Sequence, residues 1–153
     1  MGTQARRYAV ALLRTIMLAS TLTAGAFIAI PGIAHADPPP PCYGSSCVGK
    51  DPTISNSSGS CSGGATTLAT ATPPGGGPAV ELRWSDWCHA NWARLQTPEP
   101  GAWNYWVQSW DGTKEYAIPY RGYAWTYMVD GTQLARACIQ GASTSQYSCT
   151  KWY

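Results

Sequence analysis

The sequence predicts a small all-β domain, built as an antiparallel barrel or sandwich of about eight strands and held together by disulfides. Short segments of alternating apolar and polar residues follow one another in the second half of the chain. This period of two is typical of strands with one buried face. Glycine, proline and aspartate pairs separate the segments, as expected for turns. No segment after the N-terminal leader has a convincing helical period.

Residues 79–95, AVELRWSDWCHANWARL, form the densest apolar stretch outside the leader. Val80, Leu82 and Trp84 alternate with charged side chains, and a second apolar segment follows almost at once. This pattern predicts two neighbouring strands through the middle of the core, clamped at Cys88.

The other strands are predicted from alternation and from the turns between them. We expect strands at 66–72, 103–110, 113–118, 122–129, 132–139 and 146–153. The residues at 73–78 are all Pro or Gly and predict a loose hairpin loop. Asp111 and Gly112 predict a tight type I′ turn, in which both residues have positive φ.

The first 36 residues have the features of a secretory signal peptide. Three arginines accompany an apolar run, 15–33, that leads to an A-x-A cleavage site at 34–36. A membrane anchor is the alternative, but Pro31 and Gly32 break the run and no basic cluster follows. We predict a signal peptide at 1–36, a proline-rich linker at 37–41, a single domain at 42–153, and secretion.

The net charge of the chain argues against nucleic acid as a partner. Three of the ten basic residues, Arg6, Arg7 and Arg14, lie in the leader, whereas all eight acidic residues follow it. The basic excess therefore belongs to the targeting signal. No basic patch remains to bind nucleic acid or an anionic membrane.

All six cysteines lie after the predicted cleavage site, which in a short exported chain indicates a disulfide framework. Zinc is the alternative, but zinc sites favour closer pairs than the Cys-x4-Cys spacing found here. Six cysteines allow 15 pairings. Among these we favour bridges between sequence neighbours, namely Cys42–Cys47, Cys61–Cys88 and Cys138–Cys149.

Several short motifs, in this order and spacing, resemble the YjfA-like family, a domain of unknown function in exported proteins of actinobacteria and some bacilli. The motifs are GKDP at 49–52, VELRW at 80–84, ANWAR at 90–94, MVDG at 128–131, ARAC at 135–138 and CTKWY at 149–153. The tryptophans around Cys88 depart from the family pattern. The resemblance implies an extracytoplasmic sensing or binding module and supplies no catalytic residues.

Few residues in the sequence point to catalysis. His89 is the sole histidine after the leader, and a small secreted hydrolase that uses it as a general base is the alternative function. A nucleophile and an orienting acid would have to meet it, yet no G-x-S-x-G or H-E-x-x-H segment is present. The carboxylates show no spacing that predicts a paired-acid site. We predict no cofactor and no metal.

Aromatic side chains are the strongest indication of function, because all eight tryptophans lie after the leader. Many of them must build the core, but on the strand at 103–110 an inward Val107 turns Trp106 and Trp110 outward together. Large aromatic side chains suit recognition. The predicted ligand-binding residues are Trp106, Trp110, Tyr116 and Tyr120.

The sequence therefore predicts a monomeric, non-enzymatic binding module whose partner is a cell-envelope polysaccharide or an extracellular protein. A secreted inhibitor that presents the loop at 73–78 or 97–101 to a protease is a further alternative.

Overall fold

A computed structural model of the chain describes residues 38–97, 104–117 and 124–153, which all belong to one unit, Ala36–Tyr153. The predicted signal peptide and Tyr120 lie outside the described residues, as does most of the predicted loop at 97–101. The elements in chain order are η1 (a 3-10 turn, Gly44–Cys47), β1 (Ser55–Asn56), β2 (Gly59–Ser60), β3 (Thr66–Ala71), β4 (Val80–Ser85), β5 (Ala90–Leu95), β6 (Tyr105–Ser109), β7 (Lys114–Tyr116), β8 (Val129–Asp130), β9 (Ala135–Gln140) and β10 (Tyr147–Cys149).

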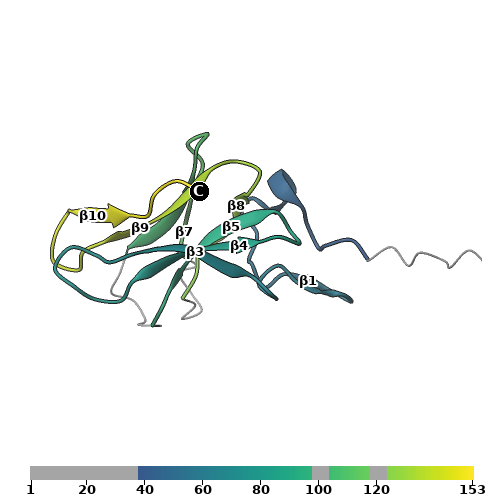
Figure 1. The fold of residues 1–153 in the computed structure, drawn as a ribbon, viewed down its shortest axis with the longest axis horizontal. Coiled ribbons are helices and arrows are strands. Elements are labelled where there is room, and N and C mark those ends of the chain that lie inside the picture. The colour runs from purple at the N-terminus through teal and green to yellow at the C-terminus, as the bar shows by residue number, and fades with distance from the viewer. Residues whose placement is uncertain (1–37, 98–103, 118–123) are drawn as a thin grey trace, which may run out of the picture. The chain divides into compact units, whose positions relative to one another are not determined.

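Two four-stranded antiparallel sheets face each other as a sandwich (Figure 1). The first sheet has the strand order β3-β4-β5-β8, and the second has the order β10-β9-β6-β7. Their facing sides enclose the main core, in which Leu82, Val107 and Ile139 are completely buried. The prediction of a disulfide-stapled all-β domain is confirmed, and a sandwich describes its architecture. Among the described residues, no helix has the length and apolar character that crossing a membrane requires.

The hairpin of β4 and β5 occupies the middle of the first sheet, as residues 79–95 predicted. The two strands pair without interruption from Val80 opposite Leu95 to Ser85 opposite Ala90. One face of β5 packs on the main core, and the other carries Trp92 into a second apolar cluster built around four cysteines. The hairpin is therefore covered on both faces.

The N-terminal segment at 42–65 provides this second cover. It has few large apolar side chains, and backbone hydrogen bonds hold it beside Met128, the residue before the edge strand β8 of the first sheet. The Gly49 N–H donates to the Met128 carbonyl at 3.0 Å, and the Met128 N–H donates to the Lys50 carbonyl at 2.9 Å. The segment also contains the small hairpin of β1 and β2, in which Ser55 pairs with Ser60.

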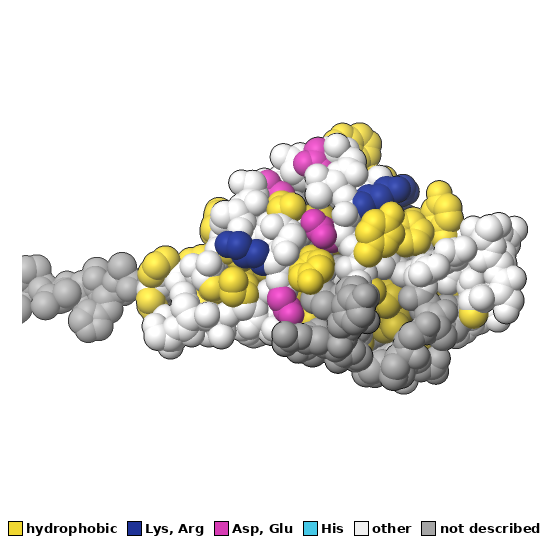
Figure 2. Space-filling model, turned by 180° about the vertical axis from the view of Figure 1, so that it is seen from behind, with side chains coloured by type: hydrophobic (Ala, Val, Ile, Leu, Met, Phe, Trp, Pro, Cys, Tyr) yellow, Lys and Arg dark blue, Asp and Glu magenta, His cyan; other side chains and the backbone are white. Residues whose placement is uncertain are grey.

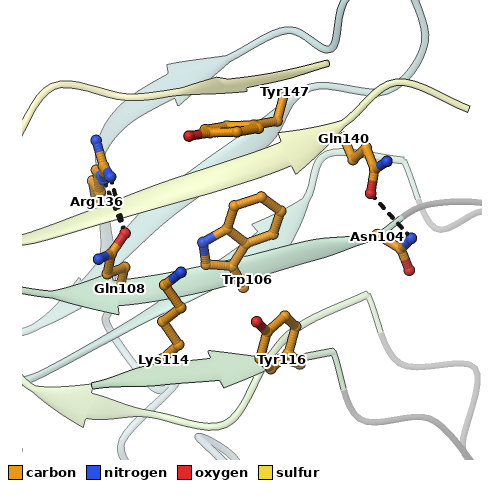
Figure 3. A pocket seen from close by; sticks show the side chains of 8 residues that line it. All are labelled: Asn104, Trp106, Gln108, Lys114, Tyr116, Arg136, Gln140 and Tyr147. Carbon is orange, nitrogen blue, oxygen red and sulfur yellow. Dashed lines mark hydrogen bonds between the residues drawn. The ribbon is translucent and has the colours of Figure 1, made fainter. Parts of the chain in front are cut away.

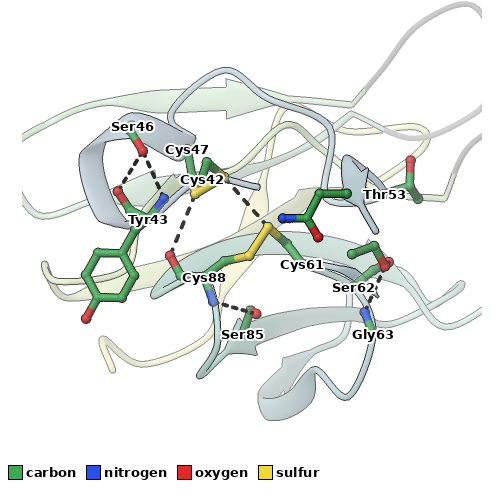
Figure 4. Close-up of a disulfide and its surroundings, with 12 residues drawn as sticks. Cys42, Tyr43, Ser46, Cys47, Thr53, Cys61, Ser62, Gly63, Ser85 and Cys88 are labelled. Atoms are coloured by element: carbon green, nitrogen blue, oxygen red, sulfur yellow. Dashed lines mark hydrogen bonds between the residues drawn. A yellow bond between two sulfur atoms is a disulfide. The ribbon is translucent and has the colours of Figure 1, made fainter. Parts of the chain in front are cut away.

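Three disulfides join Cys42 to Cys47, Cys61 to Cys88 and Cys138 to Cys149, so the predicted pairing of sequence neighbours is confirmed. The second bridge ties the N-terminal segment to the turn between β4 and β5. The Sγ atoms of Cys42 and Cys61, which belong to different bridges, are 3.7 Å apart (Figure 4). The four sulfur atoms of these two bridges all lie within 4.8 Å of one another.

The turn after β6 differs from the predicted type I′ form. Gly112 has a φ of 94°, but Asp111 does not have a positive φ, and the Gly112 N–H donates to the Ser109 carbonyl at 3.0 Å. This pattern fits a type I turn closed by a glycine bulge. The Asp111 carboxylate accepts a hydrogen bond from the Thr113 N–H at 2.9 Å, and this bond holds the pKa of Asp111 below its usual value.

Other strand predictions were too long, and one hairpin was missed. Of the described residues in the strand predicted at 122–129, namely 124–129, only Val129 lies in a regular strand, while Trp125 and Thr126 make isolated bridges. The strand predicted at 132–139 starts at Ala135, and the strand predicted at 146–153 ends at Cys149. The strands β1 and β2 were not predicted, because their Ser, Asn and Gly residues show no apolar alternation.

Unfolding at alkaline pH is expected to depend on Tyr105. Its side chain is 4 % exposed in the main core, and burial raises its pKa to about 12. An unfolded tyrosine has a pKa of about 10, so between about pH 10 and 12 only the unfolded state loses this proton. The free energy of unfolding should then fall by about 1.4 kcal/mol per pH unit. Below pH 10 this group causes no pH dependence.

The measurement is denaturation by guanidinium chloride at pH 9 and pH 11. Tyr105→Phe should lose less stability between these pH values than the wild type, whereas Tyr43→Phe, at an exposed position, should behave as the wild type does. If the wild type and Tyr105→Phe lost the same stability between pH 9 and pH 11, Tyr105 would not be the cause of the pH dependence.

Candidate ligand-binding groove

The outer face of the second sheet carries side chains that the strand register brings together. Trp106 on β6 lies opposite Tyr116 on β7 and opposite Cys138 on β9. Gln108 likewise lies between Lys114 and Arg136. Because alternate residues of a strand share a face, these side chains point away from the core residues Tyr105 and Val107.

These side chains line a groove of about 540 Å³ on the sheet surface. Trp106 forms its floor, and its ring centre lies 6.2 Å from that of Tyr116 and 5.5 Å from that of Tyr147 (Figure 3). Both tyrosines are 57 % exposed. The groove thus has an aromatic surface that runs across the strands, in which the Tyr116 and Tyr147 rings are inclined to the Trp106 ring by 39° and 60°. Its lining residues are Asn104, Trp106, Gln108, Lys114, Tyr116, Arg136, Gln140 and Tyr147.

Polar groups lie at both ends of the groove, on either side of the aromatic surface along the strand direction. At one end the Asn104 amide donates to Oε1 of Gln140 at 3.2 Å. At the other end Gln108 Oε1 accepts hydrogen bonds from Nε and Nη2 of Arg136, at 3.2 and 3.0 Å. Between them, Nε1 of Trp106 is buried and donates to no acceptor among the described residues.

Beyond Arg136 the aromatic surface continues with two tryptophans. The Arg136 guanidinium lies 4.5 Å from the ring centre of Trp152, and Trp110 meets Trp152 edge-on at 5.1 Å. Trp110 is 63 % exposed. On the face drawn in Figure 2, hydrophobic side chains likewise reach the surface directly beside Lys and Arg side chains.

Of the four predicted binding residues, the structure brings Trp106 and Tyr116 together in the groove. Trp110 faces outward as expected but lies outside the groove lining, in contact with Trp152. Tyr120 lies outside the described residues. Their role in binding stays a prediction.

Sequence reasoning missed the residues that β9 and β10 contribute to the groove, chiefly Arg136, Gln140 and Tyr147. The alternation of Arg136 and Gln140 with buried Ala137 and Ile139 was a signal for their outward position. The sequence did not indicate that β9 pairs with β6, because that pairing joins strands far apart in the chain.

His89 lies in the turn between β4 and β5 and is the one described non-glycine residue with a positive φ, 46°. Its ring stacks on Tyr43, with ring centres 4.5 Å apart, and lies 5.3 Å from Trp84. Among the described residues, its imidazole forms no hydrogen bond to a hydroxyl or a carboxylate of the kind that a catalytic triad needs.

The one group of possible metal ligands within the described part of the chain consists of Cys42, Cys47, Cys61 and Cys88. All four sulfur atoms are engaged in disulfides. A bridged sulfur offers no thiolate, which is the form that binds zinc.

Comparison with known proteins gives a family but no function. The model of the family described as "Protein of unknown function (DUF2690)" matches residues 45–139, more than half of the chain, and the chain belongs to this family. No curated protein and no solved structure matches it. The matched residues include most of the groove but end before Tyr147. The YjfA-like resemblance stays a prediction.

Proposed function

We propose that this member of the DUF2690 family is an exported, non-enzymatic module that binds a cell-envelope glycan in the aromatic groove. The observation that carries the proposal is the position of Trp106 in the floor of an open groove. Tyr116 flanks it on the neighbouring strand, and Tyr147 flanks it two strands away on the other side. Polar side chains stand at both ends.

This arrangement suits the chemistry of a sugar ring, which has an apolar face of C–H groups and an edge of hydroxyls. Tryptophan and tyrosine supply flat apolar area together with a polar group. The amides of Asn104, Gln108 and Gln140 supply both donors and acceptors. The groove volume is within the usual range of about 300–1,000 Å³ for small-ligand sites.

Export is supported by three features, one from the structure and two from the sequence. Three disulfides are typical of proteins that fold in an oxidising compartment. The sequence of 1–36 predicts a signal peptide, and the YjfA-like resemblance implies an extracytoplasmic module.

Replacing Trp106 with alanine should abolish most glycan binding. A central aromatic anchor typically contributes 2 kcal/mol or more, so the affinity should fall by about 30-fold or more. The measurement is co-sedimentation of the oxidised protein with purified peptidoglycan, followed by calorimetric titration with soluble polysaccharides. Trp106→Phe, which keeps an aromatic surface, should retain part of the affinity.

Tyr43→Ala is the matched control, because it removes an exposed aromatic side chain outside the groove and should leave binding unchanged. Near-ultraviolet circular dichroism checks that each variant is folded. Wild-type affinity in a folded Trp106→Ala variant would show that the groove is not the site. If the wild type binds none of the glycans, the proposal is rejected in favour of a protein partner.

A further inference from the structure

We propose that the groove selects a negatively charged glycan, whose carboxylate or phosphate groups bind Arg136 and Lys114. This inference rests on the proposed function of the groove and adds the chemical class of the ligand. Three observations carry it. Two positive charges line the groove, the Arg136 guanidinium has a fixed orientation, and no counter-charge is found among the described residues.

The guanidinium of Arg136 is held in place before any ligand binds. Nε and Nη2 both donate to the single neutral oxygen Oε1 of Gln108, and the guanidinium lies against the Trp152 ring. Among the described residues, Nη1 makes no hydrogen bond. A guanidinium with this free edge offers paired donors to an oxyanion, and little side-chain freedom remains to be lost on binding.

The positive charge of the groove is not neutralised by the described part of the protein. The ion pairs found there all belong to Glu81, which contacts Arg83 and Arg94 on the other sheet. Among the described residues, none that lines the groove is acidic, and neither Lys114 nor Arg136 has an ion-pair partner there. The groove therefore carries a positive charge. The residues after the leader taken together carry a negative net charge, because acidic residues outnumber basic ones there.

The nearest acidic residues in the sequence do not enter the groove. Glu115 follows Lys114 on β7, so alternation turns it to the opposite face, and it approaches Gly49 of the N-terminal segment instead. Asp111 stays in the turn after β6, where Thr113 binds its carboxylate.

A neutral glycan in this groove would remove water from two cations without supplying an opposite charge, which is unfavourable. An anionic glycan would replace that water with charge-assisted hydrogen bonds, about twice as strong as neutral ones. The groove should therefore discriminate between chains of the same backbone that differ only in charge.

The test compares polygalacturonate with its fully methyl-esterified form, which has the same backbone without the charges, in calorimetric titrations at low and high salt. Wild-type protein should bind the acidic form at least about 10-fold more tightly, and added salt should reduce the preference. Purified wall teichoic acid, a phosphate polymer, distinguishes a phosphate ligand from a carboxylate ligand.

The variants are Arg136→Gln, Lys114→Gln and the double substitution. Each single change should reduce the preference for the acidic chain several-fold, and the double variant should bind both forms equally. Arg136→Lys keeps the charge and should keep much of the preference. Lys50→Gln removes a positive charge from the N-terminal segment and should leave binding unchanged.

Equal binding of the acidic and esterified chains by the wild type would overturn this inference. If Trp106→Ala then lost both ligands, the proposed glycan site would still stand. A preference that survives in the folded double variant would also overturn the inference. Failure to bind any charged or neutral glycan would reject both proposals together.

Discussion

Replacing Gly131 with alanine is expected to destabilise the domain by about 3–5 kcal/mol, or to prevent folding altogether. Gly131 follows β8, and its N–H donates to the His89 carbonyl at 2.9 Å. A Cβ atom at this position would lie 2.7 Å from the Ala90 nitrogen and 2.7 Å from the His89 carbonyl carbon, and closer still to the Trp84 ring. Because the first two are backbone atoms of the central hairpin, side-chain rotation cannot relieve the overlap.

The control for this prediction is Gly64→Ala. Gly64 has a φ of 71°, but a Cβ there would meet nothing within 4 Å, so only the backbone preference is lost, at a cost of about 1–2 kcal/mol. Denaturation of both oxidised variants by guanidinium chloride, followed by tryptophan fluorescence, gives the comparison. Equal losses in the two variants would show that the close packing at Gly131 is not the reason for its glycine.

Removing the Cys61–Cys88 bridge by a double substitution to alanine should lower the free energy of unfolding by about 3.5 kcal/mol. The bridge closes a loop with a sequence separation of 27, and loop-closure entropy gives this value. The bridge also fastens the N-terminal segment over β4 and β5, so its loss should expose Trp92. A domain of this size has a total stability of about 5–15 kcal/mol, and the variant would retain little of it.

The Cys42→Ala/Cys47→Ala double variant is the matched comparison. That bridge has a sequence separation of only 5, and the same relation gives about 2 kcal/mol. Substituting both partners avoids a free thiol in either variant. Denaturation curves of the two variants should therefore differ by about 1.5 kcal/mol. If both variants lost the same free energy of unfolding, or if the Cys42→Ala/Cys47→Ala variant lost more, loop closure would not explain the stabilisation.

The parts of the fold that could be predicted are those determined by local pattern. Val80, Leu82 and Trp84 alternate with charged residues, and the structure places them on one side of β4. The turn at Asp111 was assigned wrongly because an Asp-Gly pair suits two turn types. The chain adopts the type I turn with a glycine bulge. In this turn the Thr113 N–H donates a hydrogen bond to the Asp111 carboxylate, a contact that the sequence pattern does not show.

The candidate site was predicted only in part, because alternation within one strand does not show which strands lie beside it. The alternation that buries Val107 turns Trp106 outward, and this could be read from one strand. The partners of Trp106 depend on which strands lie beside β6. Tyr147 reaches the groove because β10 pairs with its sequence neighbour β9 and β9 pairs with β6. The second of these pairings joins residues that are far apart in the sequence.

The sandwich places the N-terminal segment at 42–65 and the candidate binding groove on opposite sides of the domain. The segment that begins at Cys42 lies on the outer side of the first sheet, whereas the groove opens on the outer side of the second. The groove can therefore face a flat, extended polymer such as a wall surface without the segment at 42–65 lying across it.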